Sequence, residues 1–151
     1  MKITIIGAGN MGGALIKGWA KKGVHELTIT ARTEKTLSRF SSEYPNIKTM
    51  LDNVEAVKDA DVIVIAVKPW LVETVINEIK VNIDFKKQII LSVAANVLTD
   101  QLRTYLGEPD AKVLYVMPNI GAEYNESMTF LAPASGVCEE VTANMKELLE
   151  G

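Results

Sequence analysis

The chain has 151 residues, of which 48% are hydrophobic, with 16 lysines and arginines against 19 aspartates and glutamates and a net charge of −3. This composition can build a core, which excludes global disorder, and the charge argues against a nucleic-acid partner. One cysteine and one histidine form neither an internal disulfide nor a structural zinc site. No apolar run is long enough to span a bilayer, and the first residues do not resemble a signal peptide. We therefore expect a cytoplasmic protein without a metal or a membrane partner.

Runs of isoleucine and valine alternate with stretches of helical periodicity along the chain. The predicted strands cover residues 2–6, 27–30, 47–50, 62–67, 89–93 and 112–117. The predicted helices cover residues 11–22, 34–42, 53–58 and 98–106, and one more opens at Pro69, since proline fits a first helical turn. The unbroken apolar run at 62–67 is typical of a strand buried on both faces, as in a parallel sheet.

The last part of the chain is predicted to add an antiparallel strand at residues 127–131 and a final helix. Val137, Val141, Met145 and Leu148 mark that helix, and Gly151 stands at its stop. The whole pattern predicts an α/β fold: a Rossmann-like, doubly wound, mostly parallel sheet with helices on both faces, in one domain over residues 1–151. Because such a sheet normally continues with another strand after a helix, we expect a truncated or isolated domain.

A glycine-rich turn follows the first predicted strand. It has the pattern G-x-G-x-x-G and consists of Gly7, Ala8, Gly9, Asn10, Met11 and Gly12. In such a turn Gly7 permits the tight bend, Gly9 lets the backbone approach a pyrophosphate, and Gly12 lets the helix pack close to the strand. The amides and dipole at the helix start then hold the anion. The turn predicts dinucleotide binding, with an ordinary structural turn as the alternative.

The end of the second predicted strand indicates which dinucleotide binds. An NAD site usually has an acidic residue there for the ribose 2′-hydroxyl, whereas this chain has no carboxylate before Glu34. Arg32 can make a charge-assisted fork to a 2′-phosphate, with help from the hydroxyl of Thr30 or Thr33. The sequence therefore favours NADP(H) over NAD(H), unless Arg32 is merely a solvated surface residue.

Three further motifs lie at the predicted carboxyl ends of strands, where ligands of open α/β sheets bind. They comprise Ala66, Val67, Lys68 and Pro69, then Ala94, Ala95 and Asn96, and then Met117, Pro118 and Asn119. The alanines would let a flat ring approach the backbone, and Lys68, extended because it precedes proline, could reach a ribose or phosphate. Close packing, a helix start and a solvated lysine are the structural alternatives.

Together these motifs resemble pyrroline-5-carboxylate reductase, the enzyme that reduces 1-pyrroline-5-carboxylate to L-proline with NADPH in the last step of proline biosynthesis. The resemblance runs in order through residues 7–12, 32, 53–57, 60–62, 66–69, 92–95 and 117–119. It implies that the glycine turn, Arg32, Val67, Lys68, Ala94 and Ala95 line NADP(H), with Asn53 near the adenosine half. It also implies that Asn119 lies near the nicotinamide and a small-molecule substrate, as the one catalytic candidate.

The chain departs from the family pattern in two places. Asn96 stands where the family usually has glycine, and Ile120 and Gly121 follow Asn119 where it usually has threonine and proline. Both departures concern the nicotinamide end. The resemblance also implies a second, helical domain for substrate binding and homo-oligomer formation, which this chain lacks, so we expect this chain to bind NADPH without efficient turnover.

Two other functions remain open on the sequence. A deazaflavin-dependent NADP reductase or related dehydrogenase shares the glycine turn and the arginine, and a free-standing NADP-binding module would need no catalysis. His25 is predicted to lie on the surface, and Cys138 to be a packed or partly buried residue without a nucleophilic role. Trp19 is predicted to lie in the core, and Trp70 to anchor a turn to the core or else to shelter the cofactor groove.

Overall fold

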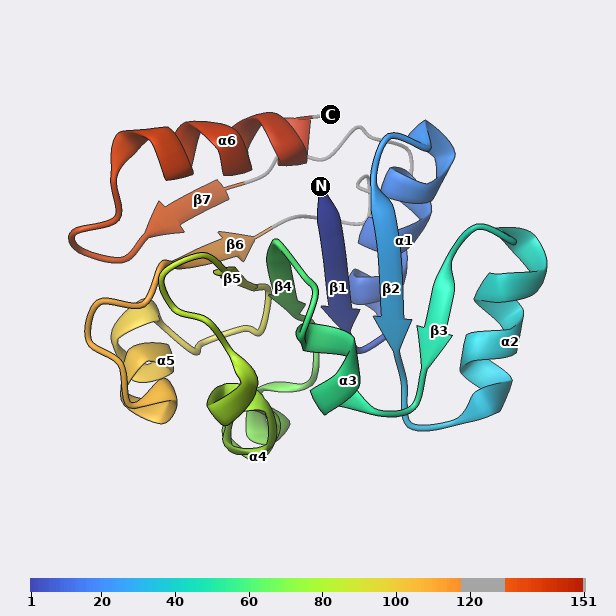
Figure 1. The fold of residues 1–151 in the computed structure, drawn as a ribbon, viewed down its shortest axis with the longest axis horizontal. Coiled ribbons are helices and arrows are strands. Elements are labelled where there is room, and N and C mark those ends of the chain that lie inside the picture. Colours follow the sequence, from blue (N-terminus) through green and yellow to red (C-terminus); the bar gives the residue numbers. More distant parts are fainter. Residues whose placement is uncertain (118–129, 151) are drawn as a thin grey trace.

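The computed structural model describes residues 1–117 and 130–150, which form a seven-stranded sheet between two layers of helices (Figure 1). The strand order is β3-β2-β1-β4-β5-β6-β7, with the first six strands parallel and β7 antiparallel to β6. The strands are β1 (Lys2–Ile6), β2 (Glu26–Thr30), β3 (Lys48–Met50), β4 (Val62–Ile65), β5 (Ile89–Ser92), β6 (Val113–Met117) and β7 (Phe130–Pro133). This is the order of a doubly wound dinucleotide-binding sheet, and it confirms the predicted fold class.

Helices lie between successive strands from β1 to β6, and α6 follows β7. The α-helices are α1 (Asn10–Lys22), α2 (Glu34–Glu43), α3 (Asn53–Val57), α4 (Val72–Ile79), α5 (Thr99–Leu106) and α6 (Glu139–Glu150). Two short 3₁₀ helices, η1 (Pro69–Leu71) and η2 (Lys80–Asn82), flank α4. Among the described helices none has the length and apolar character needed to cross a membrane.

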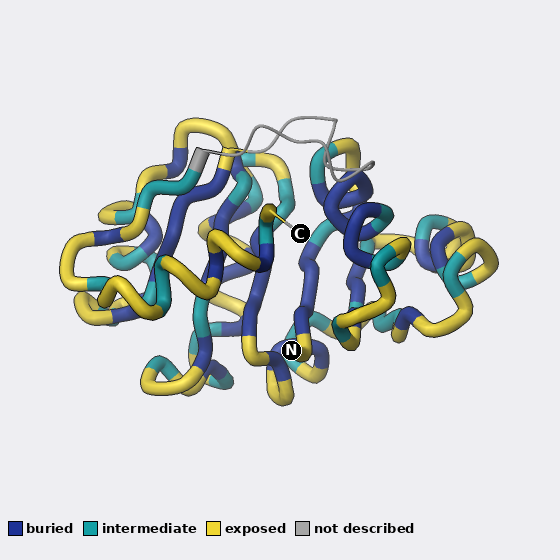
Figure 2. The backbone as a smooth tube through the Cα atoms, turned by 90° about the horizontal axis from the view of Figure 1, so that it is seen from above, coloured by how far each residue is buried: buried dark blue, intermediate teal, exposed yellow. Residues whose placement is uncertain are grey.

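Two hydrophobic cores lie on opposite faces of the sheet. One joins α1, α2 and α6 to the strands and includes Trp19, Phe40 and Met145, while the other joins α3, α4 and α5 and includes Ile76 and Leu102. Residues of β4 alternate between the two cores, which is why its sequence is apolar without interruption. Buried backbone runs through the centre of the molecule and exposed backbone through its outer turns (Figure 2).

Most predicted boundaries lie within one residue of the observed ones, and three elements differ by more: β4, the last strand, and α6, which begins at Glu139 and so leaves out Val137. Strand β4 ends at Ile65, not at residue 67, because its neighbours β1 and β5 end at Ile6 and Ser92 and offer no ladder beyond that point. The predicted last strand is antiparallel as expected but runs through Phe130–Pro133; residues 127–129 and Gly151 lie outside the described residues.

Candidate functional site

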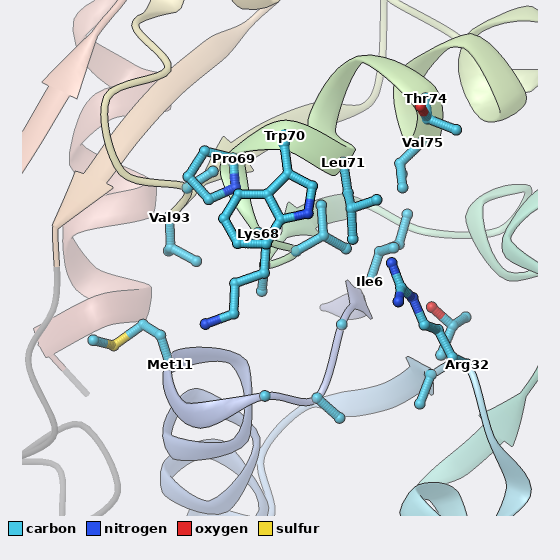
Figure 3. A pocket seen from close by; sticks show the side chains of 18 of the residues that line it. Ile6, Met11, Arg32, Lys68, Pro69, Trp70, Leu71, Thr74, Val75 and Val93 are labelled. Carbon is cyan, nitrogen blue, oxygen red and sulfur yellow. The ribbon is translucent and has the colours of Figure 1, made fainter.

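A cleft of about 1100 Å³ opens at the carboxyl ends of β1, β2, β4, β5 and β6. Between β1 and β4 the strand order reverses, so the turns after these strands separate and leave the crevice in which open α/β sheets bind ligands. We call residues 7–13 the glycine side of this cleft and residues 66–71 the lysine side. Figure 3 shows side chains from both sides pointing toward the space between them.

The glycine side is shaped by three glycines with different tasks. Gly7 has a φ of 103°, and a Cβ atom there would lie 2.6 Å from the Ala66 carbonyl oxygen. A Cβ on Gly12 would lie 2.2 Å from the Gly7 oxygen, whereas a Cβ on Gly9 would meet no atom within 4 Å. Gly7 and Gly12 therefore serve close packing of α1 against the sheet, and only Gly9 leaves open space at the cleft.

The start of α1 points backbone amides at the cleft. Its N-cap, Gly9, offers no side-chain hydrogen bond, and the first turn contains no acidic residue. The Gly13 amide donates to the Gly9 oxygen at 2.7 Å, so in a regular helix the amides before Gly13 have no partner within the helix. Together with the helix dipole, these amides make an anion site.

Two basic side chains, Arg32 and Lys68, line the cleft at separate places. Both are exposed, and neither has an ion pair or a side-chain hydrogen bond among the described residues. Arg32 extends from the end of β2, while Lys68 extends from the lysine side toward the first turn of α1 (Figure 3). The cleft thus offers two cations to an anionic ligand, in a chain whose net charge is −3.

Of the two threonines predicted to assist Arg32, Thr30 lines the cleft and Thr33 does not; Thr36, which was not predicted, lines it as well. Thr33 is the N-cap of α2, where its Oγ1 accepts a hydrogen bond from the Thr36 amide at 3.4 Å. The Oγ1 atoms of Thr33 and Thr36 lie 3.2 Å apart, so the cap also positions the Thr36 hydroxyl. Like Thr33, Gly12 lies outside the lining as far as the described residues show.

The part of the cleft beyond Arg32 combines an amide with an apolar wall. Asn53 starts α3, and its Nδ2 donates to the Glu78 carboxylate at 3.5 Å. The wall includes Leu51, Leu71 and Val75. A flat heterocycle with polar edges fits such surroundings, because its faces can lie on alkyl groups while its edge reaches the amide.

Sequence reasoning missed the wall that α4 contributes. The residues concerned, Leu71, Thr74, Val75 and Glu78, lie at intervals of three, one and three along the helix and share one face. The available signal was their position at the end of the lysine side, in the case of Leu71, or just after it. It was overlooked because the strong apolar periodicity of α4 describes the face that packs on the sheet.

The opposite end of the cleft is formed by the ends of β5 and β6. Ala94 is buried and its amide donates to the Ser92 Oγ at 3.3 Å, while Ala95 and Asn96 are exposed and line the cleft with Tyr115. Asn96 has a φ of 63°, the left-handed conformation that asparagine tolerates better than most residues. Asparagine therefore suits this backbone conformation, as glycine would. Asn119 lies outside the described residues.

The remaining predictions concern residues that carry no proposed role in catalysis. His25 lies at the amino end of β2, where burial, then the Met1 ammonium group and Lys22, lower the pKa of its imidazole. Trp19 is in the core as predicted, with its Nε1 donating to the Leu148 oxygen at 3.1 Å. Two predictions were wrong: Cys138 is exposed rather than partly buried, and Trp70, 76% exposed, anchors nothing in the core.

The fold and the cleft define a dinucleotide-binding domain, and comparison with known proteins identifies its family. The family model described as "NADP oxidoreductase coenzyme F420-dependent" matches residues 2–96, more than half of the chain. The chain belongs to this family of NADP-linked oxidoreductase domains. The match covers the glycine turn, Arg32, Asn53 and the lysine side, and it agrees with the NADP-type cofactor predicted from Arg32.

The curated relatives are more specific. The pyrroline-5-carboxylate reductase of Vibrio alginolyticus is 34% identical to this chain over 99% of the chain's length. The pyrroline-5-carboxylate reductase of Escherichia coli K12 is 32% identical over 95% of the chain. The solved pyrroline-5-carboxylate reductase of Coxiella burnetii superposes with a TM-score of 0.89 at 27% identity, over 98% of this chain and 55% of its own. The predicted resemblance is confirmed. The chain spans about half the length of the curated relatives it matches, 54% in both bacterial cases.

Proposed function

We propose that this chain is the cofactor domain of a pyrroline-5-carboxylate reductase, which reduces 1-pyrroline-5-carboxylate to L-proline with NADPH. The observation that carries the proposal is the convergence of the α1 amides, Arg32 and Lys68 on one cleft, in a chain 34% identical to such a reductase. Substrate recognition and homo-oligomer formation are assigned to the part of the relatives that this chain does not match.

Each part of the dinucleotide finds a matching part of the cleft. In the proposal the α1 amides and Lys68 bind the diphosphate, and Arg32 binds the 2′-phosphate through a charge-assisted fork, with Thr36 held beside it by Thr33. Asn53 and the α4 wall hold the adenosine. The small side chains of Ala66, Ala94 and Ala95 admit the nicotinamide close to the backbone. Asn119, which lies outside the described residues, keeps the role near the nicotinamide that the resemblance implies.

In the proposed reaction the main task of the protein is to orient the cofactor and the substrate. When bound, NADPH supplies the hydride that the imine carbon accepts. A protonated imine is a good hydride acceptor by itself, so the proposed reaction needs no strong general acid from this domain. The described lining of the cleft is consistent with that: it offers backbone, amide, hydroxyl and cationic groups and one carboxylate, Glu78, which fix position and charge.

The test is a calorimetric titration of the chain with NADPH and with NADH. We expect NADPH to bind more tightly, and we expect Arg32→Asp to weaken NADPH binding by about a hundredfold, because a charge-assisted fork is lost and a repulsion is gained. NADH binding should change only a few-fold. Arg39→Asp is the matched control, because it changes the charge by the same amount. Arg39 lies on α2 over the Phe40 ring and does not line the cleft.

Two results would contradict the proposal. Equal losses for NADPH and NADH in Arg32→Asp would show that this arginine does not read the 2′-phosphate. Ready reduction of 1-pyrroline-5-carboxylate by this chain alone, followed as loss of NADPH absorbance, would show that the unmatched half of the relatives is not needed for turnover.

A further inference from the structure

Trp70 is unusual because so large an apolar side chain lies in solvent. It is 76% exposed, whereas Trp19 is 4% exposed. Exposed aromatic side chains at the rim of a cavity commonly mark contact surfaces, because burying a ring on binding removes a large apolar area from water. Trp70 lines the proposed cofactor cleft, so a ligand of this cleft could bury the indole.

The backbone that carries Trp70 is held in place although its side chain is not buried. Pro69 starts η1, and the Leu71 amide donates to the Lys68 oxygen at 2.9 Å, which closes the turn. Val72, the next residue, has no exposed surface and ties the turn to the core. The indole is therefore presented from a fixed point, so covering a ligand would require little ordering of the backbone.

The direction of the side chain matches this role. Figure 3 shows the indole extending from η1 toward the cleft, next to Lys68, with Met11 beyond the Lys68 amino group on the glycine side. Lys68 and Trp70 line the same cleft as Gly7 and Gly9. The attraction between an ammonium and a phosphate is weak in water and grows as water is excluded.

We propose that the Trp70 indole closes over the bound dinucleotide where Lys68 meets the diphosphate, and that it shields this ion pair from solvent. The proposal rests on the proposed function, because it takes NADP(H) as the ligand of the cleft. It makes Trp70 a binding residue that acts partly by contact and partly through Lys68.

Calorimetry of the whole 151-residue chain tests the contact. NADPH should bind about tenfold more weakly to Trp70→Ala, while Trp70→Phe, which keeps a flat ring, should stay within about threefold of the unsubstituted chain. Raising the salt concentration from about 0.05 M to about 0.5 M should weaken binding more steeply in Trp70→Ala, because the exposed ion pair is better screened. Val81→Ala removes another exposed apolar side chain outside the cleft and should change nothing.

Fluorescence provides a second, independent measurement, since the chain has only two tryptophans. The probe is NADP⁺, because NADPH absorbs at the wavelengths of tryptophan emission and would quench Trp19 by energy transfer wherever it bound. NADP⁺ should quench or shift the emission of the unsubstituted chain, and the change should be absent in Trp70→Phe, which retains only Trp19. An affinity for Trp70→Ala equal to that of the unsubstituted chain, or an emission change that persists in Trp70→Phe, would overturn the proposal while leaving the proposed function intact. Failure of the unsubstituted chain to bind NADPH would overturn both.

Discussion

The glycine side of the cleft leaves almost no room for side chains, whereas the lysine side holds side chains that the fold leaves in solvent. Gly7 and Gly12 are packed so closely that a Cβ atom would overlap backbone at 2.6 and 2.2 Å. Lys68 and Trp70 are exposed. Packing therefore dictates the residues of the glycine side, which sets where an anion can lie. The exposed side chains of the lysine side are not required by packing and are available to contact a ligand.

The largest expected effect comes from a substitution on the glycine side. Gly12→Ala places a methyl group 2.2 Å from the Gly7 carbonyl oxygen, and backbone cannot yield as a flexible side chain can. We expect a loss of at least about 3 kcal/mol in the free energy of unfolding, measured by urea denaturation, and a parallel loss of NADPH binding.

Gly9→Ala is the matched control for this prediction. Its Cβ meets no atom within 4 Å, and the φ of −74° suits alanine. Stability should change by less than about 1 kcal/mol, yet NADPH should bind at least about tenfold more weakly, because the methyl group occupies space that the diphosphate needs. Equal stability of the two variants would break the distinction between packing and ligand glycines.

The lysine side should show the reverse behaviour. Lys68→Met removes a charge from an exposed side chain, so we expect an unfolding free energy within about 0.5 kcal/mol of the original and NADPH affinity about tenfold lower. The salt dependence of binding should also become shallower. Lys87→Met, an exposed lysine just before β5 at the amino end of the sheet, is the control. An unchanged affinity in Lys68→Met would remove Lys68 from the site.

Asn96 combines features of both sides, since it needs a special backbone and also lines the cleft. Asn96→Ala should lose about 1 kcal/mol of stability, because a φ of 63° crowds a Cβ atom that has no local polar compensation. Asn96→Gly should be neutral or slightly stabilising. Thermal unfolding of the three chains measures this, and an alanine variant as stable as the glycine variant would show that the conformation carries no strain.

The smallest effect is expected from His25, outside both sides of the cleft. Burial lowers its pKa below the ordinary value of 6.5, so below about pH 6.5 the unfolded chain binds a proton that the folded chain does not. Stability is therefore full above that pH and falls as the pH drops toward the lowered pKa. In His25→Asn the midpoint of urea unfolding should depend less on pH between about pH 7.5 and pH 5.5 than in the original chain. The affinity for NADPH should change with pH in the same way in His25→Asn and in the original chain, since His25 lies at the opposite end of β2 from Arg32.

Much of the fold could be predicted because the signals are local. Alternating buried runs and amphipathic stretches identified the strands and helices, and the glycine turn and Arg32 were recognised by their spacing from the first two strands. The boundaries that failed, such as the end of β4, depend on where neighbouring strands end. No stretch of the chain carries that information by itself.

The sequence by itself determined the class of domain, its family resemblance and the glycine, arginine and lysine motifs. Each of these depends on short stretches of residues and on their order along the chain. Only the tertiary structure decided that Thr36 and not Thr33 lines the cleft, that one face of α4 forms its wall, and that Trp70 lies in solvent while Trp19 is buried. The physical reason is that burial and lining depend on which distant segments the sheet brings together. The strand order β3-β2-β1-β4-β5-β6 gathers the ends of five strands around one crevice.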